Sequence, residues 1–412
     1  MKPFAPVTIV VKRSSLDRRH RCADKDACSS IDPFPLPQFP PPRLAFVVTE
    51  DWFFVSHFLP MIRAATEAGF EPLVIARVRE HRGAIEAMGA RVVPLEAERR
   101  SLDPFKAAAT FWRLARILRR ERVSAVHCIA LRGILNGGVA AMLAGVSRRV
   151  FAVTGGGFLS AHASRRAKLS ARVLRFAIRH LFRTRTTRYL FENEDDPRSF
   201  GLDQSEPDVW VVGGAGVDPD YFQPVPLPPT PPLRVAVVAR MLWSKGVDLA
   251  VEAVRLARAA GAAVELSLYG LPDPSNPQSV PRATLEDWSK RDGITWHGRT
   301  SDVREVWAVH HIACLPSRGG EGLPRSILEA AACGRAVLTT DVPGCRSFVR
   351  DEVDGFVVPP DNAEALAEKL VALARDPVRV AAMGTNARAR VLDGYREKDV
   401  VETVAALYRT LA

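Results

Sequence analysis

Short apolar runs alternate with longer amphipathic segments along most of the 412-residue chain. The apolar runs predict a first series of strands at Leu44–Val48, Pro72–Ala76, Ala90–Pro94, Ala125–Ile129, Arg149–Thr154, Tyr189–Phe191 and Val209–Val212. A second series is predicted at Arg234–Ala239, Ala263–Tyr269, Ile294–His297, Ile312–Pro316, Val337–Thr339 and Phe356–Val358. Helical spacing of apolar residues is found over about 57–68, 104–121, 134–144, 164–182 and 400–411. This alternation predicts an α/β fold whose parallel sheets are covered by helices on both faces.

Two proline-rich segments divide the chain. Residues 1–42 are polar and then rich in proline, without apolar periodicity, and are expected to form a disordered tail. Residues 224–232 are expected to form a stiff linker. The prediction is therefore two doubly wound, Rossmann-like domains over 43–223 and 233–397, with a closing helix over 398–412. Two such domains would face across a cleft at the carboxyl ends of their strands, where open sheets bind ligands.

Composition narrows the class of protein. Hydrophobic residues make up 47% of the chain, which is enough for two cores, but no apolar run approaches the roughly 20 residues of a membrane-spanning helix. The run Val7–Val11 is too short to serve as the core of a signal peptide. The six cysteines form no CxxC pair, which favours a reducing cytoplasm.

The formal charge of +11 is concentrated in one segment. Between Gly155 and Phe191 there are nine Lys or Arg residues and no acidic residue, with apolar residues between them at helical spacing. A basic amphipathic helix of this kind is typical of contact with an anionic membrane, through Arg165, Arg166, Lys168, Arg172, Arg175 and Arg179. The alternative is a helix packed on the core with a solvated basic face. Nucleic-acid binding is disfavoured because no recognition motif accompanies the cluster.

The most informative segment is Arg318–Ala330, which places two carboxylates eight positions apart around a Gly-Leu-Pro turn. Glu321 lies in the predicted loop, followed by Gly322 and Leu323, and Glu329 lies two turns into the predicted helix. The start of a helix attracts phosphates. The segment therefore outlines a nucleotide-sugar site. The alternative is that Glu321 only compensates the helix dipole and that Glu329 lies on a solvated face.

Two cations follow the first strand of the second series. Arg240 is at its carboxyl end, and Lys245 and Gly246 precede the next helix. This pattern suits a pyrophosphate, although both residues could equally be ordinary loop charges. There is no HExxH and no Ser/His/Asp order. We therefore expect Arg240, Lys245 and helix N–H groups to neutralise the phosphates, without a required metal or cofactor.

Four motifs of the C-terminal half, in order, resemble the retaining glycosyltransferases of family 4, which have the GT-B fold. These motifs are Val238–Gly246, Leu315–Ser317, Arg318–Ala330 with its Glu-x7-Glu spacing, and Thr340–Cys345. The resemblance implies that Arg240 and Lys245 hold the phosphates of the donor, that Glu321 orients its sugar, and that Glu329 binds the ribose. Gly322 and Leu323 would also bind the donor, and the turn at Gly298 and Arg299 would face the base.

Motifs of the N-terminal half resemble the branch of this family that extends lipid-linked glycans. They are Thr49–His57, Val126–Cys128, Arg132–Gly138, Val153–Phe158, Phe191–Asn193 and Gly213–Asp218. The resemblance makes the first domain the acceptor-binding one, through Asp51, Ser56, His57, Arg132, Thr154 and Gly155. It also places His127 near the transferring sugar, where a hydrogen bond to a hydroxyl or phosphate is favoured over general-base work. The alternative for His127 is a satisfied structural histidine.

The resemblance implies transfer of a hexose or N-acetylhexosamine, with retention, from a UDP-sugar to a polyprenyl-diphosphate-linked saccharide. The protein would then be peripheral on the inner face of the cytoplasmic membrane and would contribute to a capsule, a lipopolysaccharide or a glycoprotein glycan. The chain departs from the family pattern at three places. The usual Gly-rich turn after the first strand is absent, and Asp51–His57 stands there, as is common in this branch. Gly156 in the Thr-Gly-x-Gly turn and Ser347 after Arg346 concern acceptor and donor detail. The alternatives are a nucleotide-sugar 2-epimerase on the same fold and a non-catalytic scaffold at the membrane.

Overall fold

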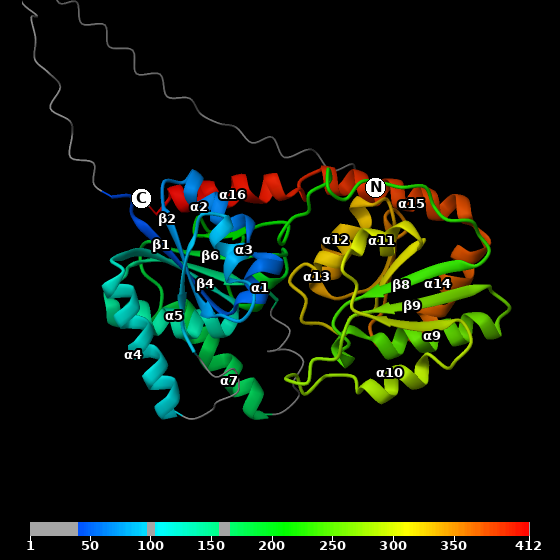
Figure 1. Ribbon diagram of the computed structural model, residues 1–412, viewed down its shortest axis with the longest axis horizontal. Helices are drawn as coiled ribbons and strands as arrows, with labels where there is room; N and C mark the ends of the chain where they lie inside the picture. The colour runs from blue at the N-terminus through cyan, green and yellow to red at the C-terminus, as the bar shows by residue number, and fades with distance from the viewer. Residues whose placement is uncertain (1–39, 97–103, 156–164, 412) are drawn as a thin grey trace, which may run out of the picture. The chain divides into compact units, whose positions relative to one another are not determined.

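The computed structural model describes residues 40–96, 104–155 and 165–411 (Figure 1). The expected tail over 1–42 lies almost entirely outside the described residues, and so do Cys22 and Cys28. Within the described residues the chain forms two separate sheets, of seven and six strands, in which the named strands all pair in parallel. The expectation of two doubly wound parallel sheets is confirmed.

The first sheet has the strand order β3-β2-β1-β4-β5-β6-β7. Its strands are β1 Arg43–Glu50, β2 Glu71–Arg77, β3 Arg91–Pro94, β4 Val123–Ile129, β5 Arg148–Val153, β6 Thr187–Phe191 and β7 Val209–Val211. The central strand β1 is buried on both faces: Leu44, Phe46 and Val48 contribute to one core, and Ala45 and Val47 to the other. This two-residue alternation follows from the pleat of a strand, and it explains why the run has no polar side.

The helices of the first half are α1 Asp51–His57, α2 Pro60–Glu67, α3 Arg82–Ala87, α4 Pro104–Arg120, α5 Ala130–Ala144, α7 Arg165–Phe176 and α8 Asp196–Ser199. The helix expected over 57–68 begins at Pro60 as α2, because Pro60 has no N–H to donate and suits the first turn of a helix, and the separate helix α1 ends at His57. The helix expected over 164–182 is α7 followed by a π-helical turn, η1, at Ala177–Leu181.

The second sheet has the order β10-β9-β8-β11-β12-β13. Its strands are β8 Leu233–Val238, β9 Val264–Tyr269, β10 Ile294–Gly298, β11 Ile312–Leu315, β12 Ala336–Thr340 and β13 Gly355–Val358. Its helices are η2 Trp243–Lys245, α9 Val247–Ala259, α10 Arg282–Trp288, α11 Val303–Ala308, α12 Arg325–Ala332, α13 Pro343–Arg346, α14 Ala363–Arg375 and α15 Pro377–Leu392. Val235 and Val237 face one core and Ala236 the other, as in the first sheet.

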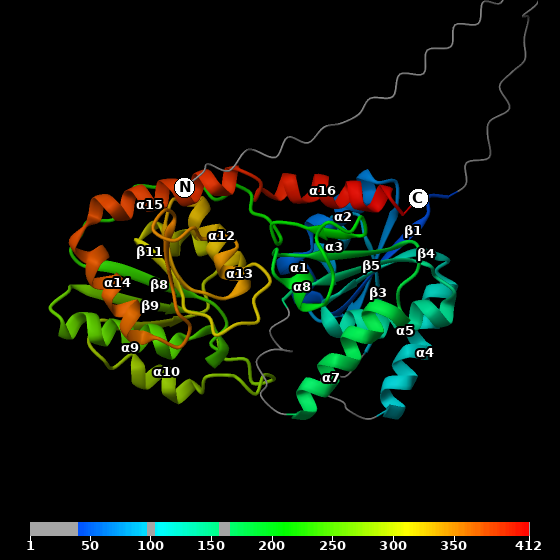
Figure 2. The ribbon, with the colours of Figure 1, turned by 180° about the vertical axis from the view of Figure 1, so that it is seen from behind.

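The last helix, α16 (Glu397–Arg409), packs on the first sheet although it follows the second in sequence (Figures 1 and 2). Val400, Val404 and Leu407 are buried in the same core as strand β1. Tyr408 is fully buried, and its hydroxyl lies 2.6 Å from Nδ1 of His127 in strand β4. The chain end is therefore part of the core of the first half.

No helix within the described ranges combines the length and the apolar character needed to cross a membrane.

The His127–Tyr408 contact gives a first prediction about stability. Tyr408→Phe should lower the free energy of unfolding by about 1–3 kcal/mol, because it leaves a buried imidazole nitrogen without a partner. Urea denaturation measures this change. Tyr221→Phe is the matched control, since the Tyr221 side chain is exposed. Equal stability of the two variants would contradict the prediction.

Candidate functional site

An ion pair at the carboxyl edge of the second sheet joins the end of η2 to the loop between β11 and α12. The Nζ atom of Lys245 is 2.6 Å and 2.7 Å from the two carboxylate oxygens of Glu321. The hydroxyl of Ser317 donates to the same carboxylate at 2.8 Å. The side chain of Glu321 is only 8% exposed and that of Lys245 20% exposed. Two of the residues singled out by the sequence are thus brought into direct contact.

The backbone around Gly246 explains why Lys245 is held at this loop. Gly246 has φ of +66°, and a Cβ atom there would overlap the carbonyl oxygen of Pro316. A glycine is therefore required both for the left-handed conformation and for the close approach of the two loops. Because Pro316 directly follows β11, this approach fixes Lys245 beside the Glu321 loop.

Arg240 lies at the end of β8, as expected, but its guanidinium is already engaged. Nη1 donates to Oδ2 of Asp273 at 3.1 Å. The guanidinium also lies over the ring of Trp52, 5.7 Å from its centroid. Trp52 belongs to α1 of the first half, so Arg240 connects the two halves at the site.

Arg325, in the first turn of α12, is a cation that the sequence did not assign to the site. Its Nε atom donates to Oε1 of Glu329 at 2.8 Å, and its Nη1 donates to the backbone carbonyl of Ser56. Burial raises the pKa of Glu329, and Arg325 opposes this rise. The spacing of four residues between Arg325 and Glu329 was visible in the sequence. The contact of Arg325 with α1 was not, because that contact joins residues far apart in the chain.

His57 lies close enough to these cations for their charges to act on it. Burial, together with the positive charges of Arg325, Lys245 and Arg240, lowers its pKa to about 4. Its Nδ1 is 2.6 Å from Oγ of Ser56. The imidazole is therefore neutral near pH 7. The three cations near this neutral ring are each paired with a carboxylate, of Asp273, Glu321 or Glu329. An anionic ligand at the site would compete with these carboxylates for the cations.

Glu192 and Asn193, which follow β6, hold the Gly-Leu-Pro turn from the first half of the chain. Asn193 Nδ2 donates to the carbonyl of Gly322 at 2.9 Å, and Glu192 Oε2 accepts from the N–H of Leu323 at 3.2 Å. Burial raises the pKa of Glu192 to about 8, and neighbouring Asp196 and Glu321 contribute to the rise. The sequence marked this pair only as a motif. The Leu323 N–H expected to hold a phosphate donates to Glu192 here.

The turn after β5 also contacts the loop that carries Glu321. A Cβ atom on Gly155, which has φ of +101°, would lie 2.5 Å from the carbonyl oxygen of Gly320 and 2.9 Å from the N of Gly322. Thr154 and Gly155, both expected to bind the acceptor, are therefore adjacent to the Glu321 loop. Gly156 lies outside the described residues.

Two further candidate acceptor residues, Asp51 and Arg132, lie in the first turns of helices α1 and α5. Asp51 is fully buried, and its carboxylate accepts hydrogen bonds from the backbone N–H groups of Trp52, Arg79 and His81. Burial opposes ionisation of Asp51, but these three hydrogen bonds lower its pKa overall. Asp51 thus fixes the start of α1, which carries Ser56 and His57. Arg132 is partly buried in the first turn of α5.

His127 is fully buried, with Phe46, Phe58 and Tyr408 around its ring. Burial lowers its pKa to about 3. A donor sugar cannot reach it in this conformation. Its Nε2, however, has no hydrogen-bond partner among the described residues. These surroundings favour the alternative that His127 is a structural histidine. Its contact with the transferring sugar stays a prediction.

Gly298 and Arg299 lie at the end of the edge strand β10. The carbonyl of Gly298 accepts from the N–H of Gly270 at 2.6 Å, and the Arg299 side chain is exposed. Their contact with a nucleotide base stays a prediction.

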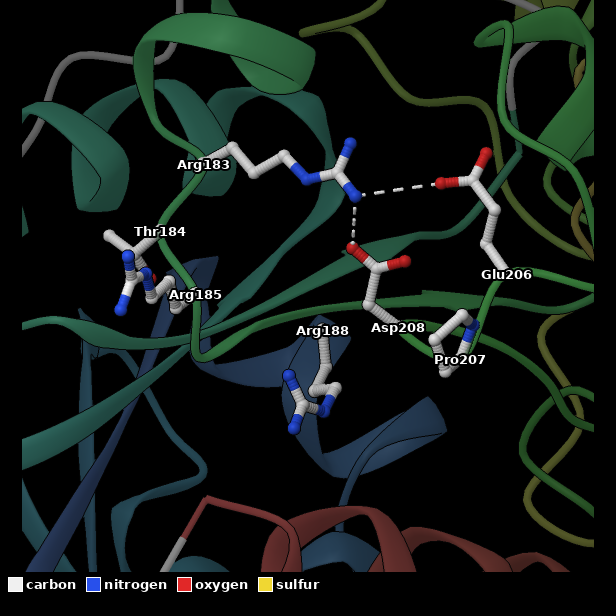
Figure 3. Close-up of a pocket in the computed structure, with 7 residues that line it drawn as sticks. All are labelled: Arg183, Thr184, Arg185, Arg188, Glu206, Pro207 and Asp208. Atoms are coloured by element: carbon white, nitrogen blue, oxygen red, sulfur yellow. Dashed lines mark hydrogen bonds and ion pairs between the residues drawn. The ribbon is translucent and has the colours of Figure 1, made fainter.

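A separate cavity of about 710 Å³ lies at the amino-terminal ends of β6 and β7 (Figure 3). It is lined by Arg183, Thr184, Arg185, Arg188, Glu206, Pro207 and Asp208. Arg183 pairs with Asp208 at 2.8 Å and Glu206 at 3.5 Å, and Arg188 donates to Thr410 Oγ1 at 2.8 Å. This end of the sheet is opposite the carboxyl edge, so the cavity is not part of the Lys245–Glu321 site.

Among the described residues, no group of three or more His, Cys, Asp or Glu side chains is arranged to hold a metal ion. The cysteines Cys128, Cys314, Cys333 and Cys345 are buried thiols without a disulfide.

Two family models match this chain. The model for glycosyl transferases group 1 matches residues 232–376, and the glycosyl transferase 4-like model matches residues 43–193. The first match contains the second sheet with Lys245 and Glu321, and the second contains most of the first sheet.

Among curated proteins, the chain is 28% identical to a Campylobacter jejuni enzyme over 86% of this chain and 95% of that protein. That protein is N,N'-diacetylbacillosaminyl-diphospho-undecaprenol alpha-1,3-N-acetylgalactosaminyltransferase. The chain is also 29% identical to the putative colanic acid biosynthesis glycosyltransferase WcaL of Escherichia coli, over 49% of this chain and 51% of the relative.

Among solved structures, the Anabaena protein HepE in complex with UDP-glucose superposes with a TM-score of 0.68 at 16% identity, over 88% of this chain and 98% of HepE. A sucrose-phosphate synthase from Thermosynechococcus elongatus gives a TM-score of 0.72 at 19% identity, over 90% and 99% of the two chains. At these identities the likeness concerns the fold alone.

The raised pKa of Glu192 gives a prediction about pH. The folded chain keeps the Glu192 proton up to about pH 8, whereas the unfolded chain loses it near the ordinary value of 4.5. The parent should therefore lose stability relative to Glu192→Gln as the pH rises between these values, with no further relative change above them. Thermal unfolding of both proteins across this range measures the difference. A constant difference in Tm would contradict the prediction.

Proposed function

Since the chain belongs to the group 1, family 4-like glycosyltransferases and has their GT-B fold, we propose that it transfers a sugar from a UDP-sugar to a polyprenyl-diphosphate-linked saccharide with retention of configuration. The observation that carries this proposal is the pairing of Lys245 with Glu321 and of Arg325 with Glu329 at the start of α12, close to Arg240 and His57. A nucleoside diphosphate and a sugar together present the charge and the hydroxyls that this set of groups recognises.

The donor diphosphate binds between the three cations and the first turn of α12. The N–H groups of a helix's first turn have no partner within the helix and attract anions. Arg240 and Lys245 neutralise the charge that develops on the leaving diphosphate. Lys245 has three hydrogens, so it can contact a phosphate oxygen and still hold Glu321.

The two carboxylates hold the rest of the donor. Glu321, fixed by Lys245 and Ser317, accepts hydrogen bonds from the sugar hydroxyls and orients the anomeric carbon. Glu329, oriented by Arg325, binds the ribose hydroxyls. Both are poorly exposed, which strengthens such bonds because water competes less. The acceptor hydroxyl attacks from the face that the diphosphate leaves, and a phosphate oxygen takes its proton.

The acceptor lies on the side of the first sheet, against the end of α1 and the turn after β5. Ser56 and His57 face the donor cations from that side, and Thr154 and Gly155 adjoin the Glu321 loop. The neutral imidazole of His57 can exchange a hydrogen bond with a sugar hydroxyl. A lipid-linked acceptor of this kind would hold the protein at the inner face of the cytoplasmic membrane.

Release of UDP tests the proposal. A panel of UDP-sugars is incubated with and without a polyprenyl-diphosphate-linked saccharide, and the configuration of the product is determined by NMR. Acceptor-dependent release of UDP and an unchanged anomeric configuration are expected. Release of UDP without transfer would indicate a nucleotide-sugar epimerase, and no turnover with any donor would indicate a scaffold. Either result overturns the proposal.

The donor contacts give a prediction about single substitutions. Lys245→Ala and Glu329→Ala should each lower kcat/KM for the donor by about 10- to 150-fold, since one charge-assisted hydrogen bond is worth about 1.5–3 kcal/mol. Lys290→Ala, an exposed lysine in the same half of the chain, is the matched control and should leave turnover unchanged. Unaltered donor kinetics in both site variants would remove these residues from the donor site.

Neutralisation of the diphosphate by arginine and lysine gives a further prediction. Transfer should persist after exhaustive treatment with EDTA, because Arg240, Lys245 and Arg325 supply the positive charge. Initial rates before and after chelation, and after restoring magnesium or manganese, measure this. A complete loss that magnesium or manganese reverses would show that a divalent cation carries that role.

A further inference from the structure

Helix α7 carries two apolar stripes, of which only one packs on the protein. Ala177, Ile178 and Phe182 continue from α7 into the core of the first sheet, with Leu174 packed against it. Leu169, Val173 and Phe176, spaced four and three residues apart, are 62%, 61% and 65% exposed. Residues with this spacing lie on one face of a helix. The core explains the first stripe but leaves the second in contact with solvent.

Helix α4 likewise has one apolar side in the core and other large apolar side chains exposed to solvent. Leu114, Ala115 and Leu118 pack in the same core as the inner face of α7. Trp112 is 52% exposed, and Phe105 in the first turn is 84% exposed. Single exposed apolar residues are ordinary, but several large apolar side chains on one side of a protein mark an interaction surface. Helix α4 and the η1 turn that continues α7 both contact α5.

The charge on these helices selects the partner. Helix α4 contains five Lys or Arg residues and α7 with η1 contains six, and neither segment contains an acidic residue. Arg113, Arg116, Arg172 and Arg179 are exposed. The side chains of Arg165, Arg166 and Lys168 lie outside the described residues. Large apolar and aromatic side chains within an all-basic surface match the interface of an anionic bilayer, which offers acyl chains below negatively charged headgroups.

The topology places this surface beside the candidate site. Helix α4 follows β3 and α7 follows β5, so both helices begin at the carboxyl edge of the first sheet. Thr154 and Gly155, at that edge after β5, adjoin the Glu321 loop. In Figures 1 and 2 the first turns of α4 and α7 extend beyond the sheet on the same side. A bilayer in contact with them would lie on the side where the acceptor is expected to enter.

We propose that α4 and α7 together form a bilayer-docking surface, in which Trp112 and the stripe Leu169, Val173 and Phe176 enter the headgroup region and the arginines bind anionic lipid. Its role in presenting the acceptor rests on the proposed function, but binding to lipid does not. The exposed stripe of α7 and the aromatic residue of α4 act on the same membrane, so each contributes to one binding event.

Sedimentation with vesicles tests the docking surface. The full chain should pellet with vesicles of phosphatidylglycerol and phosphatidylcholine at low salt, and much less with phosphatidylcholine alone or at high salt, where screening weakens the attraction. The double variant Trp112→Gln, Phe176→Gln should bind at least about tenfold more weakly, because it removes two large apolar groups from the interface. Val378→Gln is the matched control, since Val378 is 78% exposed on α15.

A second pair of variants separates the contribution of α4 from that of α7. Arg113→Glu with Arg116→Glu should weaken binding by about tenfold or more, because each cation near an anionic surface contributes roughly fivefold. Lys290→Glu with Lys398→Glu places the same charge change on an exposed turn after α10 and on the exposed side of α16, and should alter binding far less. Brominated lipid should quench the fluorescence of the parent more than that of Trp112→Phe, which reports the depth of Trp112 directly.

The outcomes distinguish this inference from the proposed function. Binding of UDP is measured by calorimetry on every variant and should be unchanged, since none of the substituted residues contacts the donor site. Vesicle binding without any glycosyl transfer would remove the proposed function and leave the docking surface. Unaltered pelleting of the Trp112, Phe176 variant, or self-association of the parent that this variant abolishes, would overturn the docking surface itself.

Discussion

The close approach of the Gly320–Gly322 turn to backbone from the first sheet is the constraint on which the site depends. A side chain at Gly155 would overlap the turn, and a side chain at Gly322 would overlap the Glu192 carboxylate. Because both positions are glycine, the two halves meet through backbone atoms. Asn193 then fixes the turn by donating to Gly322. The positions of Glu321 and of the start of α12 follow from this contact.

The pKa shifts of His57 and Glu192 follow from the same contact between the two halves. Lys245 and Arg325 belong to the second half, but the groups they face, Ser56 and His57, belong to the first. The imidazole of His57 has a lowered pKa because it is buried among cations, and the carboxyl of Glu192 has a raised pKa because it is buried near acids. These opposite shifts have one origin, which is the low polarity where the two halves touch.

Burial also separates residues that look alike in sequence. Asp51 and His127 both lie near the ends of strands of the first sheet, yet both are enclosed by the protein. The Asp51 carboxylate accepts hydrogen bonds from three backbone N–H groups, and His127 is hydrogen-bonded to Tyr408 of the last helix. Ser56 and His57, on the next turn of chain, face the cations instead. The apolar residues of α7 divide in the same way between the core and solvent.

The sequence by itself determined the strands, the two parallel sheets and the order of the motifs, because strand and helix periodicities are local properties of the chain. It also marked Lys245, Glu321 and Glu329, whose spacing and turn residues are visible along the chain. Only the tertiary structure decided the partners: Glu321 for Lys245, Trp52 and Asp273 for Arg240, and Glu192 for the N–H of Leu323. It also decided that α16 returns to bury Tyr408 against His127, and that one apolar stripe of α7 stays exposed. These contacts join residues far apart in sequence, and no local pattern specifies which of them come together.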